Sequence, residues 1–186
     1  MKSITAAGEE CAPTGNTLST ETLAQRFELL LALHGAALRR LAASYARTAT
    51  DRDDLLQEIF MALWLALPRF RGECSARTFV FRIAHNRGIT HYSRSTATRP
   101  LSDQDAEHVQ PTVDATEATL SQEQQWEKLL NAVHGLPIIY RQVIVLALEG
   151  FEYREIAEVL GISDNNVAVR VNRARQLLKQ LLEDDR

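Results

Sequence analysis

The chain has 186 residues, of which 45% are hydrophobic and 24% are charged, a balance typical of soluble globular proteins. Its two cysteines, Cys11 and Cys74, show neither a CxxC pair nor the Cys/His spacing of a zinc site, which argues against a disulfide framework and fits a reducing cytoplasm. No apolar run approaches the roughly 18 residues of a membrane span, and the N-terminus lacks the apolar centre of a signal peptide, so we expect neither membrane insertion nor export.

The net charge of −3 hides a segregation of charge along the chain. Seven arginines stand between residues 69 and 99 with a single acid, Glu73, whereas residues 100–127 hold seven acids and neither lysine nor arginine. A basic segment beside an acidic one is expected where the first meets phosphates and the second stays solvated and away from nucleic acid.

The N-terminal part of the chain divides into a tail and a helix. Residues 1–19 mix Gly, Pro, Ser, Thr and Glu without periodicity, which predicts a mobile tail. From Thr20, apolar residues recur at three- and four-residue steps and predict a helix that reaches Tyr45. This helix opens a predicted helical domain that covers residues 20–96.

The next predicted helix begins near Asp51 and stops at Pro68, which cannot continue a helix. It carries more apolar residues than one buried stripe requires, and the polar pair Gln57 and Glu58 stands among them. We therefore expect part of its surface to face a partner. A helix fully buried in a small bundle would also fit the periodicity.

A short loop containing Gly72 leads into a third helix, predicted from about Ser75 to Arg94. One side of this helix is apolar, and the other offers Arg82, His85, Asn86 and Arg87. Arginines and amides interleaved with aromatic rings suit single-stranded DNA, where bases stack on rings and phosphates pair with guanidinium groups. A generic basic surface is the alternative interpretation.

Residues 97–121 combine prolines with acidic and small polar residues, and predict a flexible acidic linker. Helical periodicity returns after it with Trp126 and again after Pro137, and Gly150 is placed to cap the second of these helices. Because no alternating strand pattern appears, the predicted fold class is all-α, with two small helical domains, 20–96 and 122–186, joined by the linker.

The last segment, from Tyr153 to Leu182, predicts a helix-turn-helix. Gly161 ends its first helix, and Ser163 is placed as the N-cap of the second. A projection of the second helix puts Val167, Val171, Ala174, Leu178 and Leu181 on the core side. The opposite side carries Asn165, Val169, Asn172 and Gln176, flanked by Ala168, Arg170, Arg173 and Arg175. Amides that bond base edges, a valine that meets a thymine methyl and arginines that hold phosphates are typical of a major-groove reader; a solvated helix with a basic end is the alternative.

Three segments in this order resemble one family, the bacterial RNA polymerase sigma factors of the extracytoplasmic-function (ECF) type. DDLLQEIFMALW resembles the helix that docks on the β′ clamp helices of core polymerase. FRGECSARTFVFRIAHNRGITHYSR resembles the loop and helix that read the minus-ten element as a melted non-template strand. LPIIYRQVIVLALEGFEYREIAEVLGISDNNVAVRVNRARQLL resembles the domain that binds the minus-thirty-five element as duplex.

The resemblance implies roles for residues in each segment. It assigns core polymerase binding to Asp54, Leu55, Gln57, Glu58 and Phe60. It assigns minus-ten binding to Phe70, Arg71, Gly72, Cys74, Arg82, His85, Asn86 and Arg87. For the minus-thirty-five element it implies Asn165, Ala168, Arg170, Asn172, Arg173 and Arg175, to which the helical projection adds Val169 and Gln176. Many family members carry a basic or hydroxyl residue where this chain has Ala168 and Val169, so the preferred upstream sequence stays open.

The function implied is that of a cytoplasmic transcription initiation factor. It would bind core RNA polymerase through the β′ clamp helices and the β flap, direct it to promoters, help to melt the minus-ten region and be held by an anti-sigma factor. No cofactor, metal or catalytic residue is expected. His85 and His91 project about 240° apart on a helix, and HExxH, GxSxG and Walker motifs are absent, which argues against an enzyme. A stand-alone helix-turn-helix regulator is the main alternative, and a helical adaptor protein is a third.

Overall fold

In the computed structural model the described residues are 17–98 and 117–184, and the regular secondary structure within them is entirely helical. In chain order the elements are α1 (Thr17–Tyr45), α2 (Ala49–Ala66), the short 3-10 helix η1 (Leu67–Arg69), α3 (Ala76–Thr98), α4 (Glu117–Gly135), α5 (Ile138–Leu148), α6 (Tyr153–Leu160) and α7 (Asp164–Asp184). The predicted all-α fold class is confirmed. The predicted mobile tail, apart from the start of α1, and most of the predicted linker lie outside the described residues.

Hydroxyl side chains cap the starts of two helices. The Ser75 hydroxyl accepts a hydrogen bond from the Thr78 backbone N–H (3.0 Å) at the start of α3, and Thr48 caps α2 in the same way. Helical backbone nevertheless extends into both ends of the predicted linker, since α3 continues to Thr98 and α4 begins at Glu117. Apolar periodicity marks only the turns that carry a buried stripe, so it misses turns without one.

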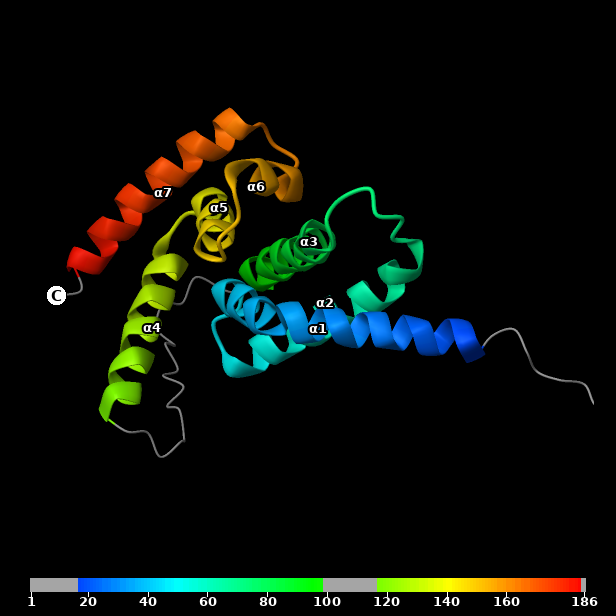
Figure 1. The fold of residues 1–186 in the computed structure, drawn as a ribbon. Coiled ribbons are helices and arrows are strands. Elements are labelled where there is room, and N and C mark those ends of the chain that lie inside the picture. The colour runs from blue at the N-terminus through cyan, green and yellow to red at the C-terminus, as the bar shows by residue number, and fades with distance from the viewer. Residues whose placement is uncertain (1–16, 99–116, 185–186) are drawn as a thin grey trace, which may run out of the picture.

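The helices α1, α2 and α3 form one packed group (Figure 1). Its core is made of side chains with almost no exposed area: Leu38, Leu41, Leu55, Ile59, Leu63, Val80 and Phe81. At Gly88 the helices α1 and α3 approach so closely that a Cβ atom would lie 2.5 Å from the Tyr45 ring. Only glycine fits this crossing without displacing the tyrosine.

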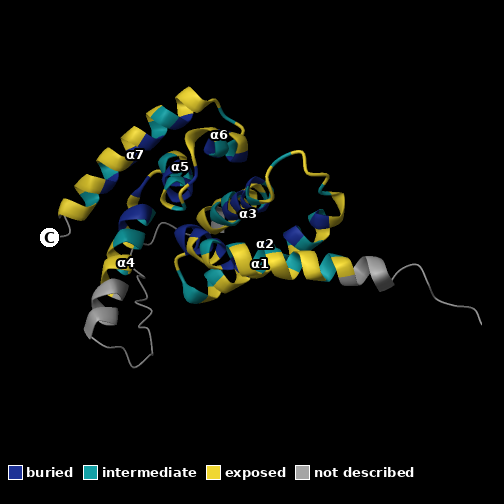
Figure 2. Cartoon of the chain, in the orientation of Figure 1, coloured by how far each residue is buried: buried dark blue, intermediate teal, exposed yellow. Residues whose placement is uncertain are grey.

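The helices α4 to α7 form the second group, and its core confirms the predicted inner side of α7. Val167, Val171 and Ala174 are fully buried, whereas the outward side of α7 is exposed along its length (Figure 2). Gly161 adopts the left-handed conformation (φ 67°) at the end of α6, as its predicted capping role requires. The Ser163 hydroxyl then accepts from the Asn166 backbone N–H (3.4 Å) and caps α7.

The two groups are in direct contact, and their buried residues form one continuous apolar cluster. The α3 helix lies against α6 and the turn before it, where Phe81 meets Phe151 edge-on with ring centroids 4.7 Å apart. The α1 helix lies against α4, where His134 Nε2 and the Ala43 carbonyl oxygen are 2.8 Å apart. The sequence predicted two helical units but contained no signal for how they meet.

Candidate nucleic-acid interface

The outward side of α7 presents most of the residues predicted to read duplex DNA. Asn165, Val169, Asn172, Arg173, Arg175 and Gln176 are exposed, while Ala168 and Arg170 are half-buried at the margins. Val169 is 62% exposed, so an apolar side chain stands in solvent between the amide and guanidinium side chains of this surface. Because Val167, Val171 and Ala174 hold the opposite side of α7 in the core, this surface is fixed relative to the rest of the second group.

The α2 helix presents a different kind of surface. Asp54 and Gln57 are exposed and Glu58 is half-buried, which agrees with their predicted place on the outside of the helix. Leu55 is not on that surface. It is fully buried with Ile59 and Leu63, whose four-residue spacing forms the core stripe of α2, so the expectation that Leu55 is available to a partner is wrong for this arrangement.

Two exposed apolar residues on α2 were missed by the sequence analysis. Met61 and Leu65 are 64% and 70% exposed, and they follow Asp54, Gln57 and Glu58 along one side of the helix at three- and four-residue steps. We call these five residues the α2 outer face. The signal lay in the sequence: once Leu55, Ile59 and Leu63 are assigned to the core, positions 61 and 65 project away from it. Phe60, also predicted as a contact, is half-buried against the core.

The loop before α3 is shaped by an aromatic pair and a glycine. Phe70 stacks on Phe79 with ring centroids 4.3 Å apart and an interplanar angle of 26°. Arg71 and Gly72 are exposed, and Gly72 has a positive φ of 79° with open space around its Cα atom. Cys74 is a half-buried free thiol. The stacked rings therefore anchor a loop whose tip is open to solvent and free to approach a ligand.

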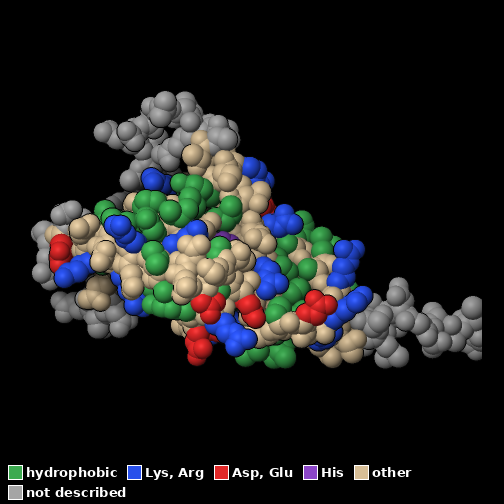
Figure 3. All heavy atoms as spheres, turned by 90° about the horizontal axis from the view of Figure 1, so that it is seen from above, with side chains coloured by type: hydrophobic (Ala, Val, Ile, Leu, Met, Phe, Trp, Pro, Cys, Tyr) green, Lys and Arg blue, Asp and Glu red, His purple; other side chains and the backbone are tan. Residues whose placement is uncertain are grey.

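On α3 itself, Arg82, Asn86 and Arg87 are exposed as predicted. The Arg82 guanidinium, however, already donates a hydrogen bond from Nη2 to the Glu158 carbonyl oxygen of α6 (3.1 Å). Seen from above the view of Figure 1, Lys and Arg side chains are spread over the molecule among hydrophobic ones, while most of the Asp and Glu side chains in view lie toward one edge (Figure 3). The exposed guanidinium groups of Arg82 and Arg87 belong to the kind of side chain that meets phosphates.

His85 does not lie with Asn86 and Arg87 on the exposed surface. Only 5% of it is exposed, and its Nδ1 atom is 2.9 Å from the Tyr45 hydroxyl of α1. Burial lowers the pKa of His85 to about 4, so the ring is neutral at pH 7. The expectation that His85 faces DNA is wrong for this arrangement. The signal that could have revealed this is Gly88, one turn further on, which permits the approach of Tyr45.

Two absences hold for the described part of the chain. Within residues 17–98 and 117–184, no helix combines the length and the hydropathy needed to cross a membrane. Among the same residues, no group of three or more His, Cys, Asp and Glu side chains is placed to hold a metal ion.

Two protein-family models match this chain, and together they cover most of the described residues. The family model "Sigma-70 region 2" matches residues 30–98, and the model "Sigma-70, region 4" matches residues 126–178. The first match contains the α2 outer face and α3, and the second contains α5, α6 and α7 as far as residue 178. A stand-alone helix-turn-helix regulator would not account for the first match.

Individual relatives agree with the family models. The RNA polymerase sigma factor CnrH of Cupriavidus metallidurans is 33% identical over 167 residues, which cover 86% of this chain and 87% of CnrH. The ECF RNA polymerase sigma factor SigM of Mycobacterium tuberculosis is 30% identical, over 84% of this chain and 76% of SigM.

Solved structures show the same fold. CnrH in complex with the cytosolic domain of CnrY aligns with a TM-score of 0.66 at 31% identity, covering 91% of this chain and 97% of CnrH. The sigma factor RpoE of Bartonella quintana, in complex with the anti-sigma factor NepR, aligns with a TM-score of 0.67 at 22% identity, covering 87% and 99% of the two chains. On these matches of sequence and fold, the chain belongs to the RNA polymerase sigma factors of the ECF type.

Proposed function

We propose that this chain acts in transcription initiation through three separate binding surfaces. The α2 outer face binds core RNA polymerase, the loop and exposed side of α3 bind the melted minus-ten strand, and the outer side of α7 binds the minus-thirty-five duplex. The observation that carries the proposal is that most residues of the three surfaces are exposed and that these surfaces lie in the two segments matched by the family models.

The α2 outer face has the chemistry of a protein-docking site. Met61 and Leu65 supply a small apolar centre, and Asp54, Gln57 and Glu58 supply a polar and acidic rim beside it. Apolar residues surrounded by polar ones are typical of the core and rim of protein interfaces, and the acidic rim suits a basic partner surface. We assign this face to the β′ clamp helices, with Met61 and Leu65 in place of the buried Leu55. The second domain would meet the β flap.

For the melted strand, the proposed contacts are Phe70, Arg71, Gly72 and Cys74 in the loop and Arg82, Asn86 and Arg87 on α3. The open loop tip at Gly72 suits the close approach of an unstacked base. Guanidinium groups pair with phosphates, and the Phe70 and Phe79 rings lie beside the loop as a stacking surface. His85 is left out because it belongs to the core.

For the upstream duplex, the proposed contacts are Asn165, Ala168, Val169, Arg170, Asn172, Arg173, Arg175 and Gln176. The side chains of Asn165, Asn172 and Gln176 can bond adenine edges, and Val169 can meet a thymine methyl group in the major groove. The arginines at the margins hold phosphates or guanine edges. Ala168 and Arg170 are half-buried at the margin of the outer side of α7, where they would contact the duplex at the edge of the interface.

We further propose that residues 20–96 and 122–186 act as two domains tethered by residues 97–121. Each DNA contact is weak alone, and joining both on one polymerase raises their combined affinity through effective concentration. Since core polymerase is cytoplasmic in bacteria, the chain would act there, and it would contribute binding energy rather than a catalytic residue. RpoE forms a complex with an anti-sigma factor, and by analogy we propose an anti-sigma partner for this chain.

Run-off transcription with purified bacterial core polymerase on a pool of promoter fragments tests this function. Transcripts that require the protein would support it, and their start sites would locate both promoter elements. Met61→Asp and Leu65→Asp should abolish these transcripts and the retention of the protein by core polymerase. Leu33→Asp is the matched control, because Leu33 is equally exposed (67%) but lies on α1. A wild-type protein that leaves core polymerase silent on every fragment would contradict the proposal.

A further inference from the structure

A pocket of about 160 Å³ lies where α1 meets α4 and α5. Its lining is mostly apolar, with Trp126, Leu129, Leu130, Val133, Val145 and Leu148. Val133 and Val145 are buried, whereas Trp126 and Leu148 are 39% and 53% exposed, so the pocket opens to solvent beside these two residues. None of its lining residues belongs to the three binding surfaces proposed for polymerase and promoter DNA.

The size and the lining of the pocket suit a small apolar molecule. A protein cavity of about 150 Å³ lined by aliphatic and aromatic side chains is large enough to hold benzene. Water in such a cavity finds few hydrogen-bond partners, so an apolar molecule that displaces it is favoured. An α-helix with its side chains is about 10–12 Å across, too wide to enter. The pocket therefore fits a single ring rather than a segment of chain.

The polar part of the lining is an ion pair and a hydroxyl group. Arg40 donates from Nε and Nη2 to the two carboxylate oxygens of Glu149, at 2.7 Å each. Within the described part of the chain Arg40 Nη1 has no acceptor, and each Glu149 oxygen keeps a further lone pair. The Ser44 hydroxyl, the third polar group, donates to the Leu41 carbonyl oxygen. This end of the pocket thus offers a donor and an acceptor that together carry no net charge.

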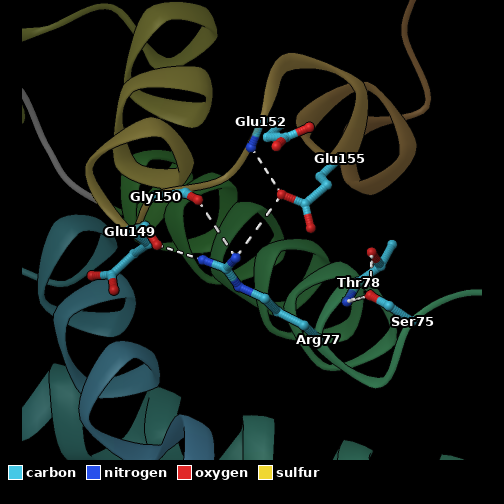
Figure 4. A network of polar contacts seen from close by, with 7 residues as sticks. All are labelled: Ser75, Arg77, Thr78, Glu149, Gly150, Glu152 and Glu155. Atoms are coloured by element: carbon cyan, nitrogen blue, oxygen red, sulfur yellow. Dashed lines mark hydrogen bonds and ion pairs between the residues drawn. The ribbon is translucent and has the colours of Figure 1, made fainter.

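Glu149 is held at both its backbone and its side chain. Arg77 of α3 donates a hydrogen bond to the Glu149 carbonyl oxygen, while the Glu149 side chain points away from Arg77, toward α1 (Figure 4). This side chain is only 10% exposed. Because it is already ordered, it loses little conformational freedom when a ligand binds beside it. The polar end of the pocket is therefore preorganised.

We propose that this pocket binds a neutral aromatic molecule of one ring with one hydroxyl group, a compound of the phenol class. The ring would fill the apolar part beside Trp126, since aromatic rings pack favourably on an indole. The hydroxyl would accept from Arg40 and donate to Glu149. A charged substituent would lose its hydration next to a pair that already balances its own charge. This site is independent of the function proposed for the chain.

The two tryptophans of the chain allow binding to be followed in the full-length protein. Trp126 lines the pocket, whereas Trp64 of α2 packs on Phe27 with ring centroids 5.3 Å apart and does not line it. In proton–nitrogen NMR spectra of isotope-labelled protein each indole N–H gives its own signal, which Trp64→Phe assigns. Phenol should shift the Trp126 signal saturably and leave the Trp64 signal in place. Benzoate and benzylamine should bind about tenfold more weakly than phenol.

Variants that line the pocket distinguish this site from nonspecific adsorption. Leu148→Ala removes part of the opening and should weaken phenol binding about threefold to tenfold. Ile139→Ala is the matched control, because Ile139 is a comparably exposed apolar residue of α5 (45%) that does not line the pocket. Val145→Phe should fill the pocket and abolish binding. Circular dichroism verifies folding, and the exposed position of Leu148 keeps the test decisive even if the buried Val145→Phe substitution unfolds the protein.

Any of three outcomes would overturn the inference: a Trp126 signal that phenol leaves in place, equal shifts of both tryptophan signals, or equal binding by Leu148→Ala and Ile139→Ala. Equal affinities for phenol, benzoate and benzylamine would overturn the assignment of the Arg40–Glu149 pair as the polar end of the site. These outcomes are distinguishable from a failure of the proposed function, which is measured by transcription with core polymerase in the absence of phenol.

Discussion

Arg94 of α3 donates from Nη2 to both carboxylate oxygens of Glu58 on α2, at 2.8 Å each. The ion pair joins the C-terminal half of the helix proposed to bind the melted strand to the rim of the α2 outer face. Both side chains are partly exposed, at 58% and 34%. An exposed pair of this kind contributes only about 0.2–1 kcal/mol to folding, so its main effect is to fix the direction of the Glu58 carboxylate.

Reversal of the Glu58 charge should weaken binding to core polymerase while changing folding stability only slightly. Glu58→Lys places two cations beside each other on the rim of the α2 outer face, and we expect it to weaken binding to core polymerase by about tenfold or more. The free energy of unfolding should fall by no more than roughly 1 kcal/mol. Co-purification with core polymerase and urea unfolding measure the two effects. Glu28→Lys, at an exposed carboxylate of α1, should change neither, and normal co-purification of Glu58→Lys would refute the assignment.

Readout of the upstream element should depend on single amides and arginines of α7. Asn165→Ala and Arg173→Ala should each cost about 1–3 kcal/mol of discrimination between the preferred and altered upstream duplexes. Competition binding by the polymerase complex on duplexes with single base changes measures this. Gln180→Ala, near the exposed C-terminal end of α7, is the matched control. An equal loss of affinity on every duplex would show that the residues contact phosphates only.

The crossing of α1 and α3 should tolerate no side chain at Gly88. A Cβ atom there would lie 2.5 Å from the Tyr45 ring, so we expect Gly88→Ala to lower the free energy of unfolding by about 1–3 kcal/mol. Gly35→Ala is the matched substitution, because the nearest atom to a Cβ at Gly35 is on the flexible Arg39 side chain, 3.9 Å away. It should raise stability by about 0.5–1 kcal/mol through better helix propensity. Equal effects of the two substitutions in urea unfolding would contradict the close crossing.

Two buried histidines predict how stability depends on pH. Burial lowers the pKa of His85 to about 4, and burial likewise lowers the pKa of His134 to about 4, against the opposing effect of its hydrogen bond with the Ala43 carbonyl. The ordinary value is 6.5, so between pH 6.5 and about 4 the unfolded chain binds protons that the folded chain does not. Stability should therefore fall as the pH falls through this window, by up to roughly 3 kcal/mol for each histidine.

Urea unfolding at a series of pH values measures this loss. In His85→Gln the group that titrates is removed while a polar partner for Tyr45 is kept. The stability of this variant should decrease less between neutral pH and about pH 4 than that of the wild type. Parallel curves for the two proteins would show that His85 does not contribute.

The sequence by itself determined the helices, the inner side of α7 and the tight corner between α6 and α7. The reason is that these features depend on neighbours within one or two turns. The caps at Ser75 and Ser163, the left-handed turn at Gly161 and the buried stripe of Val167, Val171 and Ala174 all follow from local spacing. The outward residues of α7 were predictable for the same reason.

Only the tertiary structure decided which predicted surface residues are covered. Whether His85 is exposed depends on Tyr45, 40 residues away, and the hydrogen bond of Arg82 depends on Glu158, 76 residues away. Arg40 and Glu149, which join the two helical groups, are 109 positions apart. Helical periodicity gives the direction of a side chain around its own axis but carries no information on the neighbouring helix that meets it. Leu55 was assigned to the polymerase surface by the family resemblance, and the burial of Leu55 in the folded chain showed that Met61 and Leu65 form the exposed side of α2 instead.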